Sequence, residues 1–270
     1  MSTFIPEISA SKVAGLVGLH AYQNPKECMY DLLCKHIPTK TRIAAIEQAE
    51  RRVPLTKVKN SVLYTQAMRD IIGTGVKLCN GQSDISGVLG DVEKQARVVV
   101  NLRHSELPEE VRDLIVSEVR GSVQRQRGTN NEHAILNTYE VDNKVEVQDR
   151  NTMTFRKDCG VYKLVGRTDG YVKAQDRIVD SKARTRWWPN VPIYDELQLR
   201  VYMELSGCAE SELVESFPDG RTRTTKYINE KDKWDSIHNC ILDAVKFMSD
   251  AVESDDRLRD IIFANTVVLK

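Results

Sequence analysis

The chain has 270 residues, 41% of them hydrophobic, which is enough for one sizeable core or for one core with a helical appendage. Its 39 basic and 39 acidic residues give a formal net charge of zero. Neutrality argues against a protein that packages nucleic acid nonspecifically, because such binding depends on an overall positive charge. Any contact with nucleic acid must therefore come from a local patch.

The six cysteines are scattered without a C-x-x-C pair, so their spacing supports neither a zinc site nor an iron–sulfur site. Scattered cysteines are typical of reduced thiols, and we expect an intracellular, reducing compartment such as the cytoplasm or nucleus of a host cell. Residues 1–7 are neither basic nor followed by a long apolar segment, so we expect no signal peptide. No apolar run is long enough to span a bilayer, so no membrane partner is expected.

The first half of the chain is predicted to be mainly helical. Residues 8–36 fit an α-hairpin whose helices are separated by residues 18–25, with Ser11 as a plausible N-cap of the first helix. Residues 35–59 contain seven basic residues but only two acidic ones. This excess of positive charge suits contact with a phosphate backbone. Each basic residue taken singly is also explained by a solvated helix face. Residues 61–125 show helical patterning, including a helix that begins at Pro108.

A new helix is predicted to begin shortly after Gly128, with Thr129 or Asn130 as its N-cap. Glu132 would then lie in its first turn, where a carboxylate also complements the helix dipole without any further role. The segment Asp142-Asn143-Lys144 is predicted to be the turn of a β-hairpin.

Two carboxylates and a lysine fall on the strands predicted next. Residues 161–165 and 170–174 are rich in β-forming residues and meet at Asp169, and Ile178 begins another strand. Side chains alternate along a strand, so Asp180 and Lys182 must emerge on the same face, with Asp169 beside them on the neighbouring strand. Carboxylate oxygens suit Mg²⁺ or Mn²⁺, and a lysine beside the ion can orient a water for attack on a phosphodiester.

The D-x-K pattern alone carries little information, because Asp142-Asn143-Lys144 fits it too. A cluster of cations and aromatic rings follows the second copy and includes Arg184, Arg186 and Trp187. Such a cluster can stack on bases or pack against a sugar–phosphate backbone. The alternative is that at least one tryptophan is buried under the following helix.

That helix is predicted over residues 194–207, ending at a glycine, with Gln198 and Tyr202 on a stripe beside its apolar face. Two strands are predicted over 213–217 and 224–228, and an amphipathic helix over 233–248. His238 lies near the apolar stripe of that last helix, where a core or rim histidine is favoured over a metal ligand.

The order of these motifs resembles the PD-(D/E)XK nuclease superfamily, and in particular its phage-type branch of lambda exonuclease and YqaJ-like recombinases. The motifs are G-x-x-x-E at 128–132, G-x-x-D-G at 166–170, D-x-K at 180–182 and Q-x-x-x-Y-M-E at 198–204. In addition, I-x-A-S at 8–11 and G-x-x-x-Y-x-x-P at 18–25 are similar to the opening of that branch. The resemblance covers residues 8–25 and 128–234.

The resemblance implies a site that holds one or two Mg²⁺ or Mn²⁺ ions. Glu132, Asp169 and Asp180 match the family's metal-binding acids, and the backbone carbonyl of Ser181 would be a further ligand. Lys182 matches the catalytic lysine.

The resemblance also implies contacts with the substrate. Gln198 matches the glutamine that supports the site and contacts the substrate, and Ser11 matches a serine that helps to hold a terminal phosphate. The arginine that precedes this serine motif in the family has no counterpart, because residues 1–7 contain no basic residue.

We therefore expect an α/β fold with a mixed central sheet of about five strands flanked by helices, as in the restriction-endonuclease-like core. A single domain over 1–270 would contain a mostly helical insertion at 35–125 and a catalytic core at 128–248. The expected function is that of a Mg²⁺-dependent deoxyribonuclease, an exonuclease in recombination, repair or viral or phage DNA processing.

Three alternatives stay open: an endonuclease of DNA or RNA, a catalytically silent nucleic-acid-binding relative, and a structural protein in which D-x-K is a coincidence. The expected partner is nucleic acid, with DNA favoured, and a homo-oligomer or a recombination partner protein is compatible with this.

Overall fold

The computed structural model describes residues 4–80 and 84–268 of the chain. The α-helices within these ranges are α1 (Ala10–Leu16), α2 (Pro25–Leu33), α3 (Ile37–Ala49), α4 (Leu55–Leu63), α5 (Gln66–Asn80), α6 (Ile85–Arg103), α7 (Glu109–Asn143), α8 (Ile193–Ser206), α9 (Lys231–Glu253) and α10 (Asp255–Ala264). The strands are β1 (Glu7–Ser9), β2 (Arg52–Pro54), β3 (Thr154–Asp158), β4 (Lys163–Arg167), β5 (Gly170–Val172), β6 (Arg177–Ala183), β7 (Glu210–Ser216), β8 (Thr222–Ile228) and β9 (Thr266–Val268).

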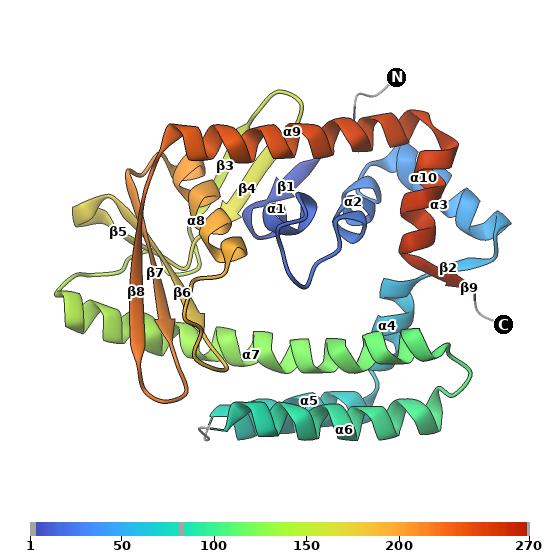
Figure 1. Ribbon diagram of the computed structural model, residues 1–270, viewed down its shortest axis with the longest axis horizontal. Helices are drawn as coiled ribbons and strands as arrows, with labels where there is room; N and C mark the ends of the chain where they lie inside the picture. Colours follow the sequence, from blue (N-terminus) through green and yellow to red (C-terminus); the bar gives the residue numbers. More distant parts are fainter. Residues whose placement is uncertain (1–3, 81–83, 269–270) are drawn as a thin grey trace.

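The predicted α/β class with mixed sheets flanked by helices is confirmed, but the strands divide among several sheets. The largest sheet has the order β5-β6-β7-β8, with β6 and β7 parallel and the other pairs antiparallel. A three-stranded sheet has the order β1-β4-β3, and β2 pairs with β9. In Figure 1, the four-stranded sheet lies at the left between α9 along the top and α7 along the bottom. The chain passes from one sheet to the other where β4 ends and β5 begins, across Thr168 and Asp169.

Helix α7 is the longest element, and it corrects two predictions. Its 35 residues span about 50 Å at the usual rise of ~1.5 Å per residue. No helix starts at Thr129 or Asn130, because α7 runs through them without a break. The hairpin predicted at residues 142–144 is also wrong: α7 ends at Asn143, and Lys144 adopts the left-handed conformation that terminates helices.

Residues 128–131 include a glycine and two asparagines, all weak helix formers, and so they suggested a break. Packing on both sides overrides this local preference. Val123 is buried in the helical layer, and Leu136 is buried against the sheet. A helix fixed at both ends of a weak segment stays helical within it, because tertiary contacts rather than propensity supply most of its stability.

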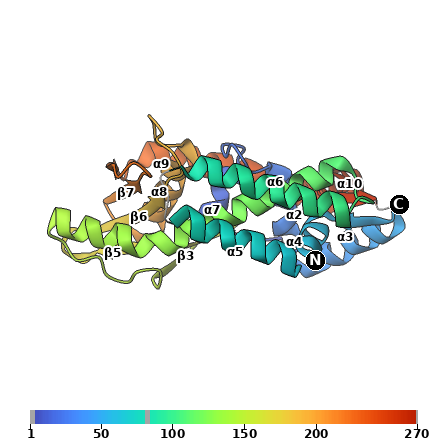
Figure 2. The same ribbon diagram turned by 90° about the horizontal axis from the view of Figure 1, so that it is seen from below.

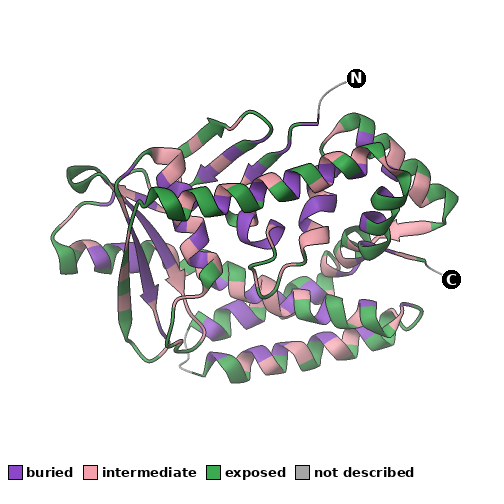
Figure 3. Cartoon of the chain, turned by 45° about the horizontal axis from the view of Figure 1, so that its top comes forward, coloured by how far each residue is buried: buried purple, intermediate pink, exposed green. Residues whose placement is uncertain are grey.

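The prediction that residues 61–125 are mainly helical is confirmed. Helices α5 and α6 lie side by side across the underside of α7, as Figure 2 shows, and the three share one hydrophobic cluster. The burial pattern in Figure 3 shows a buried stripe along one side of these helices and an exposed stripe along the other. No helix in the described ranges is both long enough and apolar enough to cross a membrane.

The N-terminal hairpin of helices is present as α1 and α2, with two differences from the prediction. The short strand β1 precedes α1 and pairs with β4. The N-cap of α1 is Ser9, which makes no side-chain capping bond, so Ser11 lies inside the first turn and its predicted capping role is wrong. Its hydroxyl is 3.5 Å from that of Ser9.

Helix α8 approaches β4 closely at Gly166. A Cβ atom on this glycine would lie 2.7 Å from Leu205 Cδ1 and 2.8 Å from Tyr202 Cε1. The absence of a side chain therefore sets how near α8, which carries Tyr202, can come to the strand that leads to Asp169.

We expect Gly166→Ala to destabilise the protein by roughly 1–3 kcal/mol, because the added methyl group overpacks this contact. Gly90→Ala in α6 is the matched control, since a Cβ there meets nothing within 4 Å and alanine is the better helix former. Denaturant unfolding of both variants checks this. Equal stability of the two variants would contradict the role given to Gly166.

Candidate active site

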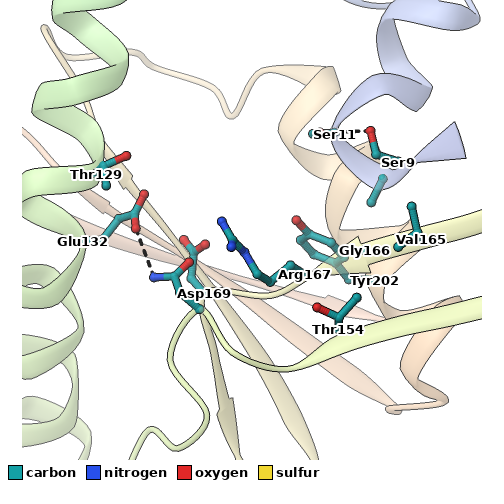
Figure 4. A pocket seen from close by; sticks show the side chains of 12 residues that line it. Ser9, Ser11, Thr129, Glu132, Thr154, Val165, Gly166, Arg167, Asp169 and Tyr202 are labelled. Carbon is teal, nitrogen blue, oxygen red and sulfur yellow. Dashed lines mark hydrogen bonds between the residues drawn. The ribbon is translucent and has the colours of Figure 1, made fainter. Parts of the chain in front are cut away.

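A cavity of about 550 Å³ opens where the start of α1, the end of β4 and the middle of α7 meet (Figure 4). Its polar lining divides by chemistry into two carboxylates, several hydroxyls, one amide and one guanidinium. These groups belong to Glu132, Asp169, Ser9, Ser11, Thr129, Thr154, Tyr202, Asn151 and Arg167. The cavity thus contains both groups that attract cations and groups that attract anions.

Asp169 is fixed to the four-stranded sheet by two hydrogen bonds. The backbone N–H of Ser181 donates to Asp169 Oδ2 at 2.8 Å, and the Ser181 hydroxyl donates to the same oxygen at 3.0 Å. Asp169 follows the end of β4, whereas Ser181 is in the middle of β6. These bonds place the carboxylate beside the strand that carries Asp180 and Lys182.

Glu132 reaches the cavity from α7. Asn151 Nδ2 donates to Glu132 Oε2 at 3.2 Å, the bond drawn as a dashed line in Figure 4. Burial raises the pKa of Glu132, and the negative charge of Asp169 raises it further. Since Glu132 lies inside a long helix, the alternative that it merely complements a helix N-terminus is wrong.

Asp180 and Lys182 share one face of β6, as the alternation of side chains predicts, and form an ion pair of 2.6 Å between Nζ and Oδ2. Asp180 is 1% exposed, and burial together with the charge of Asp169 raises its pKa to about 7. Burial alone would lower the pKa of Lys182, but the charges of Asp180 and Asp169 outweigh this and raise it. The lysine therefore stays cationic.

The other oxygen of Asp180, Oδ1, is buried and has no hydrogen-bond partner among the described residues. Neither Asp180 nor Lys182 contributes to the lining of the cavity. In the described part of the chain, no three His, Cys, Asp or Glu side chains gather closely enough to form a metal site by themselves. The structure thus brings Asp169 next to Glu132 and next to the Asp180–Lys182 pair, without closing a complete cage.

Gln198 lies on α8 and does not reach the cavity itself. Its Nε2 donates to the hydroxyl oxygen of Tyr202 at 2.7 Å, and Tyr202 lines the cavity. Tyr202 is 4% exposed and close enough to Asp180 for that charge to raise its pKa, after the larger effect of burial. Sequence reasoning placed Tyr202 on the correct stripe of the helix but gave it no role in the site.

The structure gives Arg184 a different role from the predicted contact with nucleic acid. Its guanidinium is 11% exposed and pairs with Glu215 at 2.6 Å and with Asp195 at 2.7 Å. Glu215 has no exposed side-chain surface and also pairs with Arg223 at 2.6 Å. Buried carboxylates need such partners, so Arg184 fastens the end of β6 to β7 and to the first turn of α8.

Arg186 and Trp187 are exposed in the loop after β6. Trp187 is 40% exposed, with Arg221 Cζ 3.9 Å from its ring centroid and the ring of Phe217 at 4.6 Å. The guanidinium of Arg186 lies 4.6 Å from the ring of Trp188, which is only half-buried. Neither tryptophan is buried under α8, so that alternative is wrong.

Sequence reasoning missed two arginines near the site. Arg127 on α7 is 8% exposed, and its Nη1 donates to the carbonyl oxygens of Ala183 at 3.1 Å and Arg184 at 3.2 Å. It ties α7 to the end of β6. Arg167, inside the G-x-x-D-G motif, lines the cavity. No spacing rule marks either residue: the partners of Arg127 lie more than 50 residues away in the sequence, and Arg167 is recognised only by its place in the cavity.

Several other residues considered in the sequence analysis make contacts within the protein rather than at the cavity. From the basic segment 35–59, Arg42 pairs with Asp255, Arg52 bonds to Thr266, and Lys59 pairs with Glu27. His238 is half-buried and hydrogen-bonded to the hydroxyl of Tyr162, which fits the core or rim position favoured for it. All six cysteines are free thiols.

No protein-family model and no curated protein sequence matches the chain. Among solved structures, the chain is similar to LHK-Exo, an alkaline exonuclease from Laribacter hongkongensis, with a TM-score of 0.51 and 12% identity over 95% of each chain. The structure of LHK-Exo in complex with dAMP matches with a TM-score of 0.41 and 13% identity over 61% of this chain and 91% of that one. A phage-related exonuclease from Haemophilus somnus 129PT matches with a TM-score of 0.41 and 16% identity over 48% of this chain and 72% of that one. The first of these similarities shows that the chain shares the overall fold of LHK-Exo.

We expect Arg184→Ala to destabilise the protein by about 3–5 kcal/mol, because it leaves the buried Asp195 without its arginine partner and removes one of the two from Glu215. Arg184→Lys should restore only part of this, since an ammonium group cannot bond both carboxylates with a planar fork. The control is Arg257→Ala, whose partner Asp250 is half-exposed and whose loss should change stability little. Denaturant unfolding measures all three, and an unchanged midpoint for Arg184→Ala would show that its ion pairs are not structural.

Proposed function

We propose that the chain is a Mg²⁺-dependent nuclease that hydrolyses phosphodiester bonds of DNA, acting as an exonuclease. The observation that carries this proposal is the placement of the Asp180–Lys182 ion pair beside Asp169, which lines a cavity together with Glu132. The similarity to the fold of an alkaline exonuclease over 95% of both chains supports it. Participation in recombination, repair or viral or phage DNA processing belongs to the same proposal.

The residues at the site fit a hard divalent cation. Asp180 Oδ1 is buried without a hydrogen-bond donor, and burial together with the charge of Asp169 raises the pKa of both Asp180 and Glu132. Such crowding of negative charge is costly unless a cation offsets it. Mg²⁺ commonly binds through one or two carboxylates and completes its shell with water and substrate phosphate, so a site without a closed protein cage suits it.

Asp169 and Asp180 would hold one or two Mg²⁺ or Mn²⁺ ions, together with Glu132 and the backbone carbonyl of Ser181. When bound, the ion would supply Lewis-acid stabilisation of the charge that develops on the phosphate. The hydrogen bonds from Ser181 and Asn151 fix Asp169 and Glu132, so these carboxylates need little reorganisation before they bind.

Lys182 would orient the attacking water. Its ammonium group stays protonated beside Asp180, so it acts by donating hydrogen bonds and by its charge rather than by accepting a proton. Gln198 fixes the hydroxyl group of Tyr202, which lines the cavity. Gln198 would therefore act on the substrate through Tyr202 rather than by direct contact.

Two further features would contact the nucleic acid. Ser11 would hold a phosphate at the hydroxyl-rich end of the cavity, together with Ser9. Arg186 and the exposed part of Trp187 would contact the strand outside the cavity. Arg221 and Phe217 lie against the ring of Trp187 and hold it in place. A homo-oligomer or a recombination partner protein stays part of this proposal.

The second candidate is an endonuclease of DNA or RNA with the same site. One observation favours it: residues 4–7, which precede the motif that contains Ser11, include no basic side chain that could hold a terminal phosphate. An endonuclease needs no such group, because it does not select chain ends.

We expect Mg²⁺ or Mn²⁺ to raise the Tm of the wild type but not of Asp180→Asn, since a ligand that binds the native state stabilises it. Asp180→Asn should also abolish cleavage while leaving thermal unfolding without metal nearly unchanged. Asp142→Asn, in the exposed D-x-K at the end of α7, is the matched control and should behave as the wild type. Equal stabilisation of wild type and Asp180→Asn by metal would show that Asp180 is not a ligand.

The wild type should degrade linear duplex DNA from its ends in the presence of Mg²⁺, leave covalently closed circles intact, and be inactive in EDTA. Lys182→Ala should lower kcat by roughly 100-fold or more, a typical loss for a positioned acid–base or electrostatic group. Lys144→Ala, in the other D-x-K, should not. Gel analysis of both substrates decides between the candidates: efficient nicking or linearisation of closed circles would favour the endonuclease.

A further inference from the structure

Arg167 is the one cationic side chain that lines the cavity among the described residues. It is the last residue of β4, opposite Thr154 of β3 in the antiparallel pair. Thr168, which follows it, has no exposed surface, so the backbone that carries Arg167 is anchored on both sides. The side chain itself is exposed to the cavity.

The guanidinium of Arg167 makes no hydrogen bond, ion pair or cation–π contact with any described residue. This sets it apart from the other arginines around the site. Arg127 bonds two carbonyl oxygens, and Arg184 and Arg223 pair with the buried Glu215. The protein uses those guanidinium groups internally, whereas all the donors of Arg167 are available to a ligand.

The position of Arg167 indicates which kind of ligand its guanidinium group would bind. In Figure 4 its side chain points into the cavity between Asp169 and Tyr202, with Glu132 across from it. Glu132 and Asp169 line the same cavity as Arg167. An anion bound to Arg167 would therefore lie beside the carboxylates that attract a metal ion.

We propose that Arg167 is a catalytic residue that binds the phosphate undergoing hydrolysis. This inference rests on the proposed function and adds a group to it. A guanidinium presents a planar fork of N–H donors that matches two oxygens of a phosphate and forms charge-assisted hydrogen bonds with them. Asp169 and Asp180 would bind the metal ion, and Arg167 would bind oxygens of the phosphate. The reacting phosphate would thus be held between the metal ion and the guanidinium group.

Arg167 makes and breaks no covalent bond in this scheme. The water oxygen forms a bond to phosphorus, and the bond from phosphorus to the leaving 3′-oxygen breaks with its electron pair on that oxygen. One proton of the attacking water reaches the leaving 3′-oxygen by way of solvent, so that this oxygen becomes a hydroxyl group. The other proton remains on the new phosphate or dissociates. As the new bond forms, negative charge builds on the non-bridging oxygens, and a preorganised donor is most effective against that charge.

The position also distinguishes the phosphate being cleaved from a terminal phosphate. In Figure 4, Ser9 and Ser11 lie at the α1 side of the cavity, whereas the side chain of Arg167 points toward Asp169 and Glu132. We therefore assign Arg167 to the phosphate at the carboxylates. Binding of a terminal 5′-phosphate instead is an outcome that the experiment can detect.

The experiment compares wild type, Arg167→Gln, Arg167→Lys and a control, Arg156→Gln. Arg156 is an exposed arginine on the adjacent strand β3 and pairs with Glu7 at the surface. Each protein is given linear DNA duplexes that carry either a 5′-phosphate or a 5′-hydroxyl, and single-turnover cleavage is measured with saturating Mg²⁺. Arg167→Gln should be slower by roughly 100-fold on both duplexes, a typical loss for one donor to a developing oxyanion.

Arg167→Lys should recover part of this rate, because it keeps the charge but loses the fork. Arg156→Gln should cleave at the wild-type rate, and all variants should unfold at the wild-type Tm. A loss confined to the 5′-phosphorylated duplex would overturn the assignment and place Arg167 at the chain end. Wild-type rates for Arg167→Gln on both duplexes would also overturn it.

A binding measurement in EDTA separates this inference from the proposed function. The affinity for the 5′-hydroxyl duplex, measured by fluorescence anisotropy at several salt concentrations, should be lower for Arg167→Gln than for wild type. The slope of log affinity against log salt should be smaller by about 0.9, as expected when one phosphate contact is lost. If wild type cleaves neither duplex, the proposed function fails, yet this change in slope would still support Arg167 as a phosphate ligand, and an unchanged slope would refute it.

Discussion

The site depends on the docking of one long helix on one strand. Helix α7 shares the hydrophobic cluster of α5 and α6 through its first half and packs on the four-stranded sheet through its second half. Between these regions Arg127 bonds the carbonyl oxygens at the end of β6, just beyond Lys182. Glu132 comes five residues after Arg127 on the same rigid helix. The position of its carboxylate relative to β6 is therefore set by the packing of the helical layer as well as by the sheet.

Buried charge is organised in two different ways on either side of this contact. Around Glu215, every strong charge has a partner inside the protein, and the arrangement fastens the loop after β6 to its neighbours. Around Asp169 and Asp180, burial and the negative charge of Asp169 raise the pKa of Asp180, and one buried oxygen lacks a donor. A structure that pairs its carboxylates with arginines in one place but leaves carboxylates crowded together nearby has a reason for the difference. The proposed binding of a cation and a substrate would supply that reason, because perturbed pKa values of this kind cluster at functional sites.

The sequence predicted the parts of the fold that depend on local periodicity. The alternation along β6 placed Asp180 and Lys182 on one face, and the helical stripe of α8 placed Tyr202 beside the apolar face. It could not predict α7 correctly, because a weak segment around Gly128 is kept helical by contacts with distant residues. The three-residue pairing of β2 with β9 was missed for a similar reason, since its partners are more than 200 residues apart. The role of Arg184 was also misjudged, because its nearest acidic partners in space come from other elements.

Arg167 shows why the chemistry of a motif is only partly contained in its pattern. In G-x-x-D-G the glycine and the aspartate have evident roles: Gly166 admits the close approach of α8, and Asp169 accepts two hydrogen bonds from Ser181. The two positions between them carry no signal of their own. In the fold, Thr168 turns inward and is fully buried, while Arg167 is exposed in the cavity. This alternation puts a cation two residues before a carboxylate and leaves it unpaired among the described residues. Under the proposed function, one short segment would thus offer a ligand for a metal ion and a ligand for a phosphate.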